Sequence, residues 1–498
     1  MSPGTPADQS LSWDAAYTLH LQGDLGAAAP AYWALLDGPE DAPGLRRMLA
    51  LIARVGGSLT LAEELEQADP LEAVSGEVLG RLARLYSNAG FHKEGVTCAK
   101  AAIDKQAAHP DLSVILGHGA LAAGDAGGAE EAFQAALQAD PDSAVAWAGL
   151  GQFERARGDI AAARSALDKA AALAPKDPEV QYNLGTLALL QGDFAAGFQA
   201  YGARWVLEGA TDLPSRMGGD PWTGGDPAGK RLFLYAEQGL GDCLMFFRFA
   251  GQLAARGAQV TLEVPARLLP LLAEAAEGVT VVPRGQIAPE QVAAQFDGHC
   301  PLMDLPWRLG LGPEDVATEG PYIQAGLDRV VHWRDHLTDG LTIGMAWQGN
   351  PDSPLEPDRS IPLLDLLPLL ALPAVQYVSL QQGDGLDQLA GLPVDVRLRS
   401  FGAALDQDGA FLDTAALMMS MDLVVTSDTS VAHLAGALGR PVWVALSKQA
   451  SWHWGLGADS TPWYPSMRLF RQDMVGDWRA PVWRMMTELG RALLDGEG

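Results

Sequence analysis

The stretch DLVVTSDTSVAHLAGALGRPVWVAL, residues 422–446, places polar residues where a ligand could bind. Its two apolar runs and the small-residue segment between them predict a strand–helix–strand unit. Asp428, Thr429 and Ser430 would begin the helix, at the carboxyl end of the first strand. The N–H groups and dipole of such a helix start favour an anion, so we expect a phosphate there. His433, one turn further on, could reach the same ligand, or could be a buried structural histidine.

A second polar turn lies in RLFLYAEQGLGDCLMFF, which begins at residue 231. Gly239, Gly241 and Asp242 follow a predicted strand and open a predicted helix. A dinucleotide fingerprint would need a third glycine where Leu244 stands, so that type of site is disfavoured. Asp242 itself has two readings, a cap of the helix start or a catalytic base.

A third candidate segment is WQGNPDSPLEPDRSIPLLDLL, which follows a predicted strand ending at residue 347. Ser360 is expected to cap a helix that tolerates Pro362 in its first turn. Arg359 directly precedes that helix, and a guanidinium beside a helix start makes a phosphate clamp; the alternative is a solvated arginine. Gln348 and Asn350 in the same segment are further candidates for donor binding.

Two glutamines, Gln381 and Gln382, follow the next predicted strand, where their amides could read a base edge or simply form a surface turn.

The chain contains no HExxH, GxSxG or Walker A string, which argues against common zinc hydrolases, esterases and phosphate-loop ATPases. Its two D-x-D strings, at 140–142 and 406–408, lie in predicted turns. No metal site is therefore expected.

From residue 231 onward, apolar strand-like runs alternate with helical segments, which is typical of parallel sheets covered by helices. We predict two Rossmann-like lobes, at residues 231–330 and 331–478, with a cleft between them. A final helix at 479–498 is expected to brace the first lobe. The three polar segments would all lie at the carboxyl edges of strands, where open sheets bind ligands.

The region before these lobes is periodic. Gly90, Gly124, Gly158 and Gly192 are spaced by 34 residues, and each lies between two helical patterns. Repeats of this length predict a helical-hairpin solenoid, with two more degenerate units before it. We expect the array at residues 11–205 and an ordered linker at 206–230. A solenoid groove suits a polypeptide, so a protein partner is expected.

Composition narrows the partners. The chain has 498 residues, 62 of them acidic and 34 basic, giving a formal charge of −28. This charge repels nucleic acid and anionic lipid, so neither is an expected partner. No stretch approaches the roughly 18 apolar residues of a membrane helix. Three scattered cysteines predict no disulfide framework. A soluble, cytoplasmic protein is expected.

The strings AEQGLGD, RSIPL and DTSVAHLAGALGRPVW, behind a 34-residue repeat, resemble bacterial tetratricopeptide-repeat (TPR) glycosyltransferases of GT-B fold, over residues 11–494. Those enzymes include flagellin-modifying proteins of alphaproteobacteria. The lobes are more distantly similar to lipopolysaccharide heptosyltransferases and to O-GlcNAc transferase. The latter has an asparagine ladder in its groove, where this chain has Arg81, Ile115, Gly149 and Asn183.

The resemblance implies sugar transfer from a nucleotide donor to Ser or Thr of a docked protein, such as flagellin. It implies Asp242 as the base, expected to stay ionised beside a helix start and hence to be weak. Arg359, Thr429 and Ser430 would hold the donor phosphate. A CMP donor carrying a nonulosonic acid such as pseudaminic acid is favoured, UDP being possible, with no other cofactor. The alternatives are a non-catalytic TPR adaptor or chaperone that binds a nucleotide, and a glycan- or lipid-directed transferase.

Overall fold

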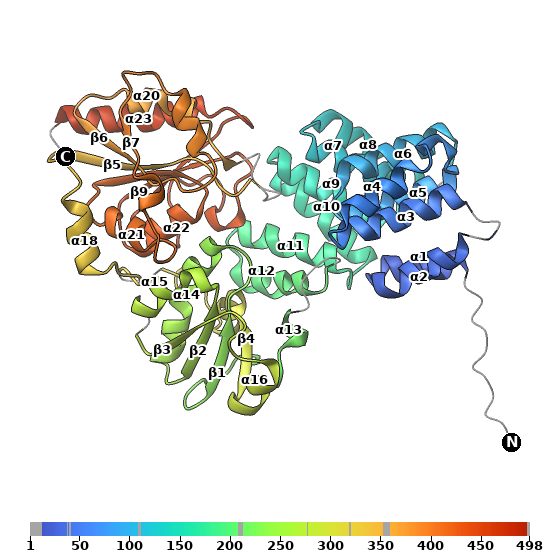
Figure 1. The fold of residues 1–498 in the computed structure, drawn as a ribbon, viewed down its shortest axis with the longest axis horizontal. Coiled ribbons are helices and arrows are strands. Elements are labelled where there is room, and N and C mark those ends of the chain that lie inside the picture. Colours follow the sequence, from blue (N-terminus) through green and yellow to red (C-terminus); the bar gives the residue numbers. More distant parts are fainter. Residues whose placement is uncertain are drawn as a thin grey trace. The chain divides into compact units, whose positions relative to one another are not determined.

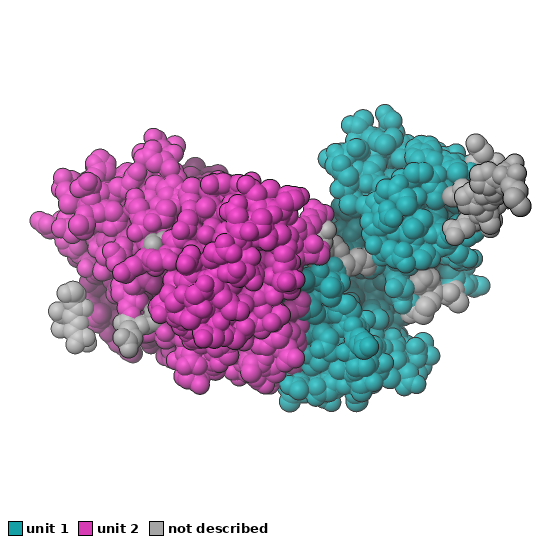
Figure 2. Space-filling view, turned by 90° about the horizontal axis from the view of Figure 1, so that it is seen from below, with its two compact units in different colours: residues 1–184, 203–211 teal, residues 185–202, 212–498 magenta. Residues whose placement is uncertain are grey.

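The structure is a computed structural model that describes residues 12–36, 38, 41–107, 111–207, 213–275, 277–317, 320–351 and 359–495. The chain divides into two compact units, coloured separately in Figure 2. Residues 1–184 and 203–211 form the first unit, and residues 185–202 and 212–498 form the second.

Twelve consecutive helices, labelled in Figure 1, form hairpins. They are α1 (Trp13–Leu21), α2 (Leu25–Leu35), α3 (Ala42–Val55), α4 (Leu59–Gln67), α5 (Gly76–Asn88), α6 (His92–Asp104), α7 (Leu112–Ala122), α8 (Ala126–Ala139), α9 (Ala144–Arg157), α10 (Ile160–Leu173), α11 (Pro178–Leu190) and α12 (Phe194–Tyr201). This confirms the predicted helical repeats.

The hairpin turns share one backbone device. A glycine in each turn has a positive φ, between 73° and 91°, a conformation that side chains with a Cβ rarely adopt; these are Gly23, Gly57, Gly90, Gly124, Gly158 and Gly192. In four turns the next residue is an aspartate that caps the second helix, namely Asp24, Asp125, Asp159 and Asp193. The repeated G-D pair therefore ends one helix and starts the next.

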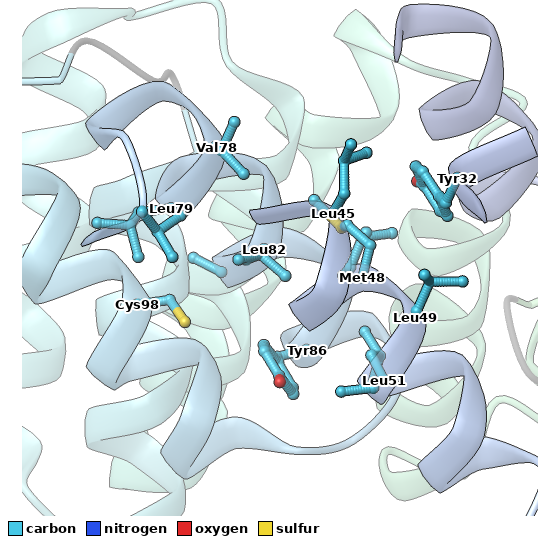
Figure 3. Close-up of a cluster of buried hydrophobic side chains, with 14 of the residues drawn as sticks. Tyr32, Leu45, Met48, Leu49, Leu51, Val78, Leu79, Leu82, Tyr86 and Cys98 are labelled. Carbon is cyan, nitrogen blue, oxygen red and sulfur yellow. The ribbon is translucent and has the colours of Figure 1, made fainter. Parts of the chain in front are cut away.

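Buried side chains of neighbouring hairpins make up the core of the first unit. Figure 3 shows Leu45 and Met48 of α3 between Tyr32 of α2 and Leu82 of α5. All four are fully buried. Each hairpin thus covers apolar side chains of its neighbour, and a second buried cluster around Phe133 continues the packing in α8 and α9.

The second unit contains two parallel α/β lobes. The first lobe has strand order β3-β2-β1-β4, with every pair parallel. Its elements are β1 (Arg231–Tyr235), α14 (Leu240–Ala255), β2 (Gln259–Val264), α15 (Leu269–Ala275), β3 (Val279–Pro283), α16 (Pro289–Gln295), β4 (Gly298–Pro301) and α17 (Leu305–Arg308), preceded by the short α13 (Leu213–Arg216).

The second lobe follows α18 (Leu327–Arg334) and has strand order β10-β9-β8-β5-β6-β7, again all parallel. Its elements are β5 (Leu341–Ala346), the 3-10 turn η5 (Leu363–Leu366), α20 (Leu367–Leu370), β6 (Val375–Ser379), β7 (Leu398–Arg399), α21 (Leu412–Met418), β8 (Leu423–Ser427), α22 (Ser430–Ala437), β9 (Val442–Leu446), the 3-10 turn η8 (Trp452–Trp454), β10 (Met467–Arg471) and α23 (Arg479–Asp495).

Each sheet has a point where the strand order reverses. In the first lobe this point lies between β1 and β4, and in the second between β5 and β8. Ligands of open parallel sheets bind in the crevice outside the carboxyl ends of the strands at such a point. The three polar segments of the sequence follow β1, β5 and β8, so all of them leave the sheets beside a reversal.

The last helix packs on the second lobe, and the expectation that it braces the first lobe is wrong. Val482, Met485 and Leu489 of α23 belong to the core that also contains Ile343 of β5 and Leu369 of α20. Figure 1 shows α23 beside α20. The apolar spacing of α23 correctly indicates a packed helix, but it does not say which lobe completes the contact.

All three cysteines are buried and unpaired; they are Cys98, Cys243 and Cys300. No helix in the described part of the chain is both long and apolar enough to cross a membrane.

Candidate active site

The candidate site lies where the starts of α14 and α22 meet, one from each lobe. A Cβ atom added at Gly241 would lie 2.9 Å from Cδ2 of His433 and 3.4 Å from the Cα atom of Ser430. Only a residue without a side chain fits this approach. Two helix starts, each with a positive dipole end, therefore face a common space.

Asp242 is the third residue of α14, and its carboxylate lies at this junction. The N–H of Gly239 donates to Asp242 Oδ2 at 3.0 Å, which fixes the side chain over the helix start. The side chain keeps 20% of its surface exposed, so a substrate could reach it. The two readings of Asp242 are thus compatible, because one oxygen caps the helix and the other faces the second lobe.

The expectation that Asp242 is a weak base is wrong. Burial, together with the charge of Asp428, raises the pKa of Asp242 from 3.8 to about 6 in the balance of all effects. Hydrogen bonds from the Gly239 and Asp242 N–H groups and the charge of Arg359 lower it, with a smaller sum. A carboxyl with this pKa is ionised at neutral pH and yet basic enough to accept a proton.

The polar start of α22 is as predicted from the sequence. Thr429 is the N-cap residue and is buried, and Ser430 is the first helical residue. The Thr429 hydroxyl lies 3.3 Å from Thr426 Oγ1 and does not cap the helix. The first-turn N–H groups of α22 therefore have no side-chain cap, which leaves them suited to an anionic ligand.

Asp428 precedes this helix and is half-buried. Its burial raises its pKa, while the nearby indole N–H of Trp454 and the charge of Arg359 lower it. The Trp454 indole N–H forms no hydrogen bond with a described residue. Its effect on Asp428 is therefore electrostatic only. Two carboxyl groups with raised pKa thus share the junction with one arginine.

His433 is buried, as the structural reading of this residue expected, yet it lines the junction. Its Nδ1 lies 3.1 Å from the Tyr464 hydroxyl, and its ring stacks on Trp454 with centroids 5.2 Å apart. Burial, together with His453 and the positive charges of Arg248 and Arg359, lowers its pKa well below 6.5. His433 is therefore neutral and contributes shape and hydrogen bonding, not charge.

Arg359 is the first described residue after the gap at 352–358. Its positive charge lowers the pKa of Asp242 and Asp428 as well as that of His433. The guanidinium is therefore close enough to act on both lobes, as a phosphate clamp would need to be. This residue is half-buried, which the solvated alternative did not anticipate.

Ser360 does not cap a helix, and that prediction is wrong. The next helical turn, η5, begins at Leu363 with Pro362 as its N-cap residue. The Ser360 hydroxyl instead accepts a hydrogen bond from the Gly349 N–H at 3.0 Å. Ser360, which directly follows Arg359, is thereby held against the backbone of Gly349.

Gln381 is not available to read a base. Its Oε1 accepts from the N–H groups of Trp347 and Gln348, and its Nε2 donates to the carbonyl oxygens of Gln348 and Asp384. Both amide donors are used, and the side chain is buried. The Gln348 side chain is also engaged, because its Oε1 accepts from Gln388 at 2.7 Å. These glutamines build the loop after β5.

Of the remaining candidates, Gln382 keeps a polar group for a ligand. The Gln382 Nε2 atom is buried and meets no acceptor among the described residues. Asn350 is exposed. Gln382 is therefore a better candidate than Gln381 for contact with the nucleotide base. Donor binding by Asn350 stays a prediction.

Sequence reasoning missed His453. It lies in η8, between Trp452 and Trp454, and its Nε2 is 3.5 Å from Asp242 Oδ1. Trp452 stacks on its ring with centroids 3.9 Å apart. The sequence could have indicated this residue, because a histidine flanked by two tryptophans follows β9. The segment after β9 begins at the carboxyl edge of the sheet, as the other site segments do.

The last repeat helix, α12, belongs to the second unit and supports these loops. Tyr201 packs on Trp452, and its hydroxyl accepts a hydrogen bond from Gln238 Nε2 at 2.9 Å. Gln238 has a φ of 50°, unusual for a residue with a side chain, and it directly precedes the glycine loop. Phe198 packs between Phe246 and Trp452. This helix therefore helps to hold the loop that presents Asp242.

No cluster of three or more His, Cys, Asp or Glu side chains able to hold a metal ion occurs in the described ranges.

The array has a hollow of its own, of about 630 Å³. Its lining comprises Asp14, Tyr17, Thr18, Gly76, Glu77, Arg81, Lys105 and Ala107. Arg81 lies over the rings of Trp13 and Tyr17 and pairs with Asp14 and Glu77. Of the four positions compared with an asparagine ladder, the other three are interior: Ile115 and Asn183 are buried, and a Cβ at Gly149 would strike Phe133.

We expect Gly241→Ala to separate the two helix starts. The new methyl group would meet the His433 ring, which Tyr464 and Trp454 hold in place, and the backbone of Ser430. We expect a destabilisation of about 1–3 kcal/mol and a loss of any activity that needs both lobes. Thermal unfolding and donor binding measure the two effects.

The matched control is Gly251→Ala in the same helix, where an added Cβ meets nothing within 4 Å. That change should raise stability by up to about 1 kcal/mol. Equal behaviour of the two variants would contradict the close approach at Gly241.

The chain thus has an N-terminal helical-repeat array followed by two parallel α/β lobes, a fold that resembles TPR-fused GT-B proteins. Two tetratricopeptide-repeat family models match residues 81–144 and 120–182.

Among proteins, Protein FlbA of Caulobacter vibrioides is 29% identical over 311 residues, which cover 59% of this chain and 52% of that protein. The chain thus spans about half the length of the curated relative it matches. Among solved structures, a family 9 glycosyl transferase of Veillonella parvula has a TM-score of 0.43 at 12% identity, over 55% of this chain and 99% of that chain. The Escherichia coli ADP-heptose lipopolysaccharide heptosyltransferase II has a TM-score of 0.39 at 16% identity, over 54% and 100% respectively. Structural likeness of this degree says nothing about activity.

Proposed function

We propose that the protein is an O-glycosyltransferase that moves a sugar from a nucleotide donor to a Ser or Thr residue of a protein acceptor. The observation that carries this proposal is the convergence of Asp242, Arg359 and the uncapped start of α22 at the strand-order reversals of two parallel sheets. A base, a cation and a set of N–H donors are what transfer from a nucleotide sugar requires.

The chemistry assigns one task to each group. As the glycosidic bond breaks, negative charge builds on the departing phosphate, and Arg359 with the N–H groups of Thr429 and Ser430 would stabilise it. The acceptor hydroxyl attacks the sugar carbon, and its proton passes to Asp242. Asp428 keeps the Asp242 pKa raised, which strengthens the base.

For the donor we propose a CMP-activated nonulosonic acid such as pseudaminic acid, with a UDP sugar as the competing possibility. This choice rests on the resemblance to flagellin-modifying enzymes. For the acceptor we propose flagellin, held by the repeat array, whose hollow offers aromatic rings and charges of both signs. A nucleotide-binding adaptor without turnover is the competing function.

Activity should fall as the pH is lowered through about 6. Asp242 must be ionised to accept a proton, and its pKa is raised to about 6. The rate should therefore be low at acid pH, rise through this range and level off above it. Because Asp428 also titrates with a raised pKa, the measured value belongs to the pair. A pH–rate profile at saturating donor checks this. A rate that does not change between about pH 5 and 8, a range that includes the expected pKa, would contradict the prediction.

Reconstituted transfer tests the proposal. The purified protein is mixed with flagellin from a strain lacking it and with either a CMP-nonulosonic acid or UDP sugars, and the intact mass of flagellin is measured. A mass increment equal to the sugar, seen with one donor, supports the proposal and identifies that donor. Donor binding without any increment on flagellin, and without donor hydrolysis, would favour the adaptor.

A further inference from the structure

His453 of the second lobe faces Asp242 of the first lobe. Its Nε2 atom lies 3.5 Å from Asp242 Oδ1 and is buried, with no partner of strict hydrogen-bond geometry in the described part of the chain. An imidazole nitrogen buried in this way normally has a partner, because leaving it unsatisfied costs free energy. The facing carboxylate oxygen is within a small shift of hydrogen-bond distance, and contacts of this type tighten when a substrate closes a site.

The imidazole ring is held from two other sides. Its Nδ1 lies 2.6 Å from Ser451 Oγ, and its face stacks on Trp452. When the Ser451 hydroxyl donates to Nδ1, the ring proton must be on Nε2, which points it at Asp242. The Gly239 N–H already occupies the other oxygen of Asp242.

The charges around the pair favour a neutral donor. Burial lowers the pKa of His453 to about 3, so its ring carries no charge at neutral pH. The other ionisable groups facing Asp242 are Asp428 before α22, Arg359 before η5 and the neutral His433 of α22. Asp428 opposes ionisation of Asp242, and Arg359 with the hydrogen-bond donors favours it.

We infer that His453 is a positioning residue: its Nε2–H donates to Asp242 Oδ1, which orients the carboxylate and favours its ionised form. The contact is a property of the fold. Its consequence for catalysis rests on the proposed function, in which a fixed carboxylate would take the acceptor proton.

Direct titration of the Asp242 carboxyl tests the contact without any transfer assay. Full-length protein with ¹³C-labelled aspartate is titrated by NMR, and the Asp242 signal is identified by its loss in Asp242→Asn. His453→Phe keeps the ring stack and removes the donor, so the Asp242 pKa should rise by about one unit. His453→Gln restores an N–H donor and should return the pKa towards the wild-type value.

Two further variants complete the test. Ser451→Ala frees the ring tautomer and should move the Asp242 pKa in the same direction by less. His20→Phe, a buried histidine beside Tyr32 in the array, should leave it unchanged. An unchanged Asp242 pKa in folded His453→Phe and Ser451→Ala proteins overturns the inference.

The catalytic consequence is read separately. In the pH–rate profile, His453→Phe should move the acid limb to higher pH. The shift should equal the change in the Asp242 pKa measured by titration, with little change in the KM for the donor. If the titration shifts but the wild-type protein transfers no sugar, the contact stands and the proposed function fails. If the wild-type protein transfers sugar but the Asp242 pKa does not shift in the variants, the proposed function stands and the inferred contact fails.

Discussion

Asp242→Asn should reduce sugar transfer by a factor of about 10² to 10⁴, the usual contribution of a positioned general base. Asparagine matches the shape of aspartate and can still accept the hydrogen bond from the Gly239 N–H, but it cannot take a proton. Donor affinity should be unchanged, because Arg359 and the start of α22 hold the phosphate in our proposal. Single-turnover transfer and calorimetric donor binding measure the two quantities.

Stability provides an internal check on this variant. The folded-state pKa of Asp242 lies above 3.8, so the ionised form is penalised by folding and this penalty is present at neutral pH. Asp242→Asn should therefore be at least as stable as wild type at pH 7, an advantage that disappears at acid pH, where the wild-type carboxyl is neutral. The control is Asp226→Asn, an exposed turn residue before β1. Full turnover by Asp242→Asn would rule out the base assignment.

Arg359→Ala should weaken donor binding and reduce transfer by a factor of about 10² or more. The positive charge of the guanidinium acts on Asp242, Asp428 and His433, and in our proposal no other cationic side chain binds the donor phosphate. The acid limb of the pH–rate profile should also move upward, because Arg359 lowers the Asp242 pKa. Arg359→Lys should keep part of the donor affinity, because lysine retains the positive charge but lacks the planar guanidinium that can donate two parallel hydrogen bonds to a phosphate.

The matched control for this arginine is Arg231→Ala. Arg231 forms an exposed ion pair with Asp297 at the amino end of β1, the opposite edge of its sheet. Its removal should change neither donor affinity nor rate and should leave stability almost unchanged, because exposed ion pairs contribute little. A folded Arg359→Ala protein with unchanged donor affinity and transfer would remove the phosphate clamp.

Much of the fold was predictable because its signals are local. The 34-residue spacing of the turn glycines and the alternation of apolar runs indicate the array and the two lobes directly. Strands β4 and β10 escaped prediction, since GHCP contains a glycine and a proline and MRLFR has arginines at two of its five positions. Such runs become strands because neighbouring strands pair with them. The docking of α23 likewise depends on contacts distant in sequence.

The site was predictable in part for the same reason. Asp242 and the start of α22 each directly follow a strand, so the parallel topology brings them to facing edges. The use of Gln381 was not predictable, because its amide bonds to backbone groups of Trp347 and Gln348, more than 30 residues away. His453 was also missed, since only the packing of η8 places it against Asp242.

The most direct test of the central claim is the intact mass of flagellin purified from the organism that encodes this protein. Three strains are compared: wild type, a deletion, and the deletion complemented with Arg359→Ala. The proposal predicts that flagellin loses discrete sugar-sized mass increments in the deletion and that the variant does not restore them. Identical flagellin masses in all three strains would contradict flagellin as the acceptor.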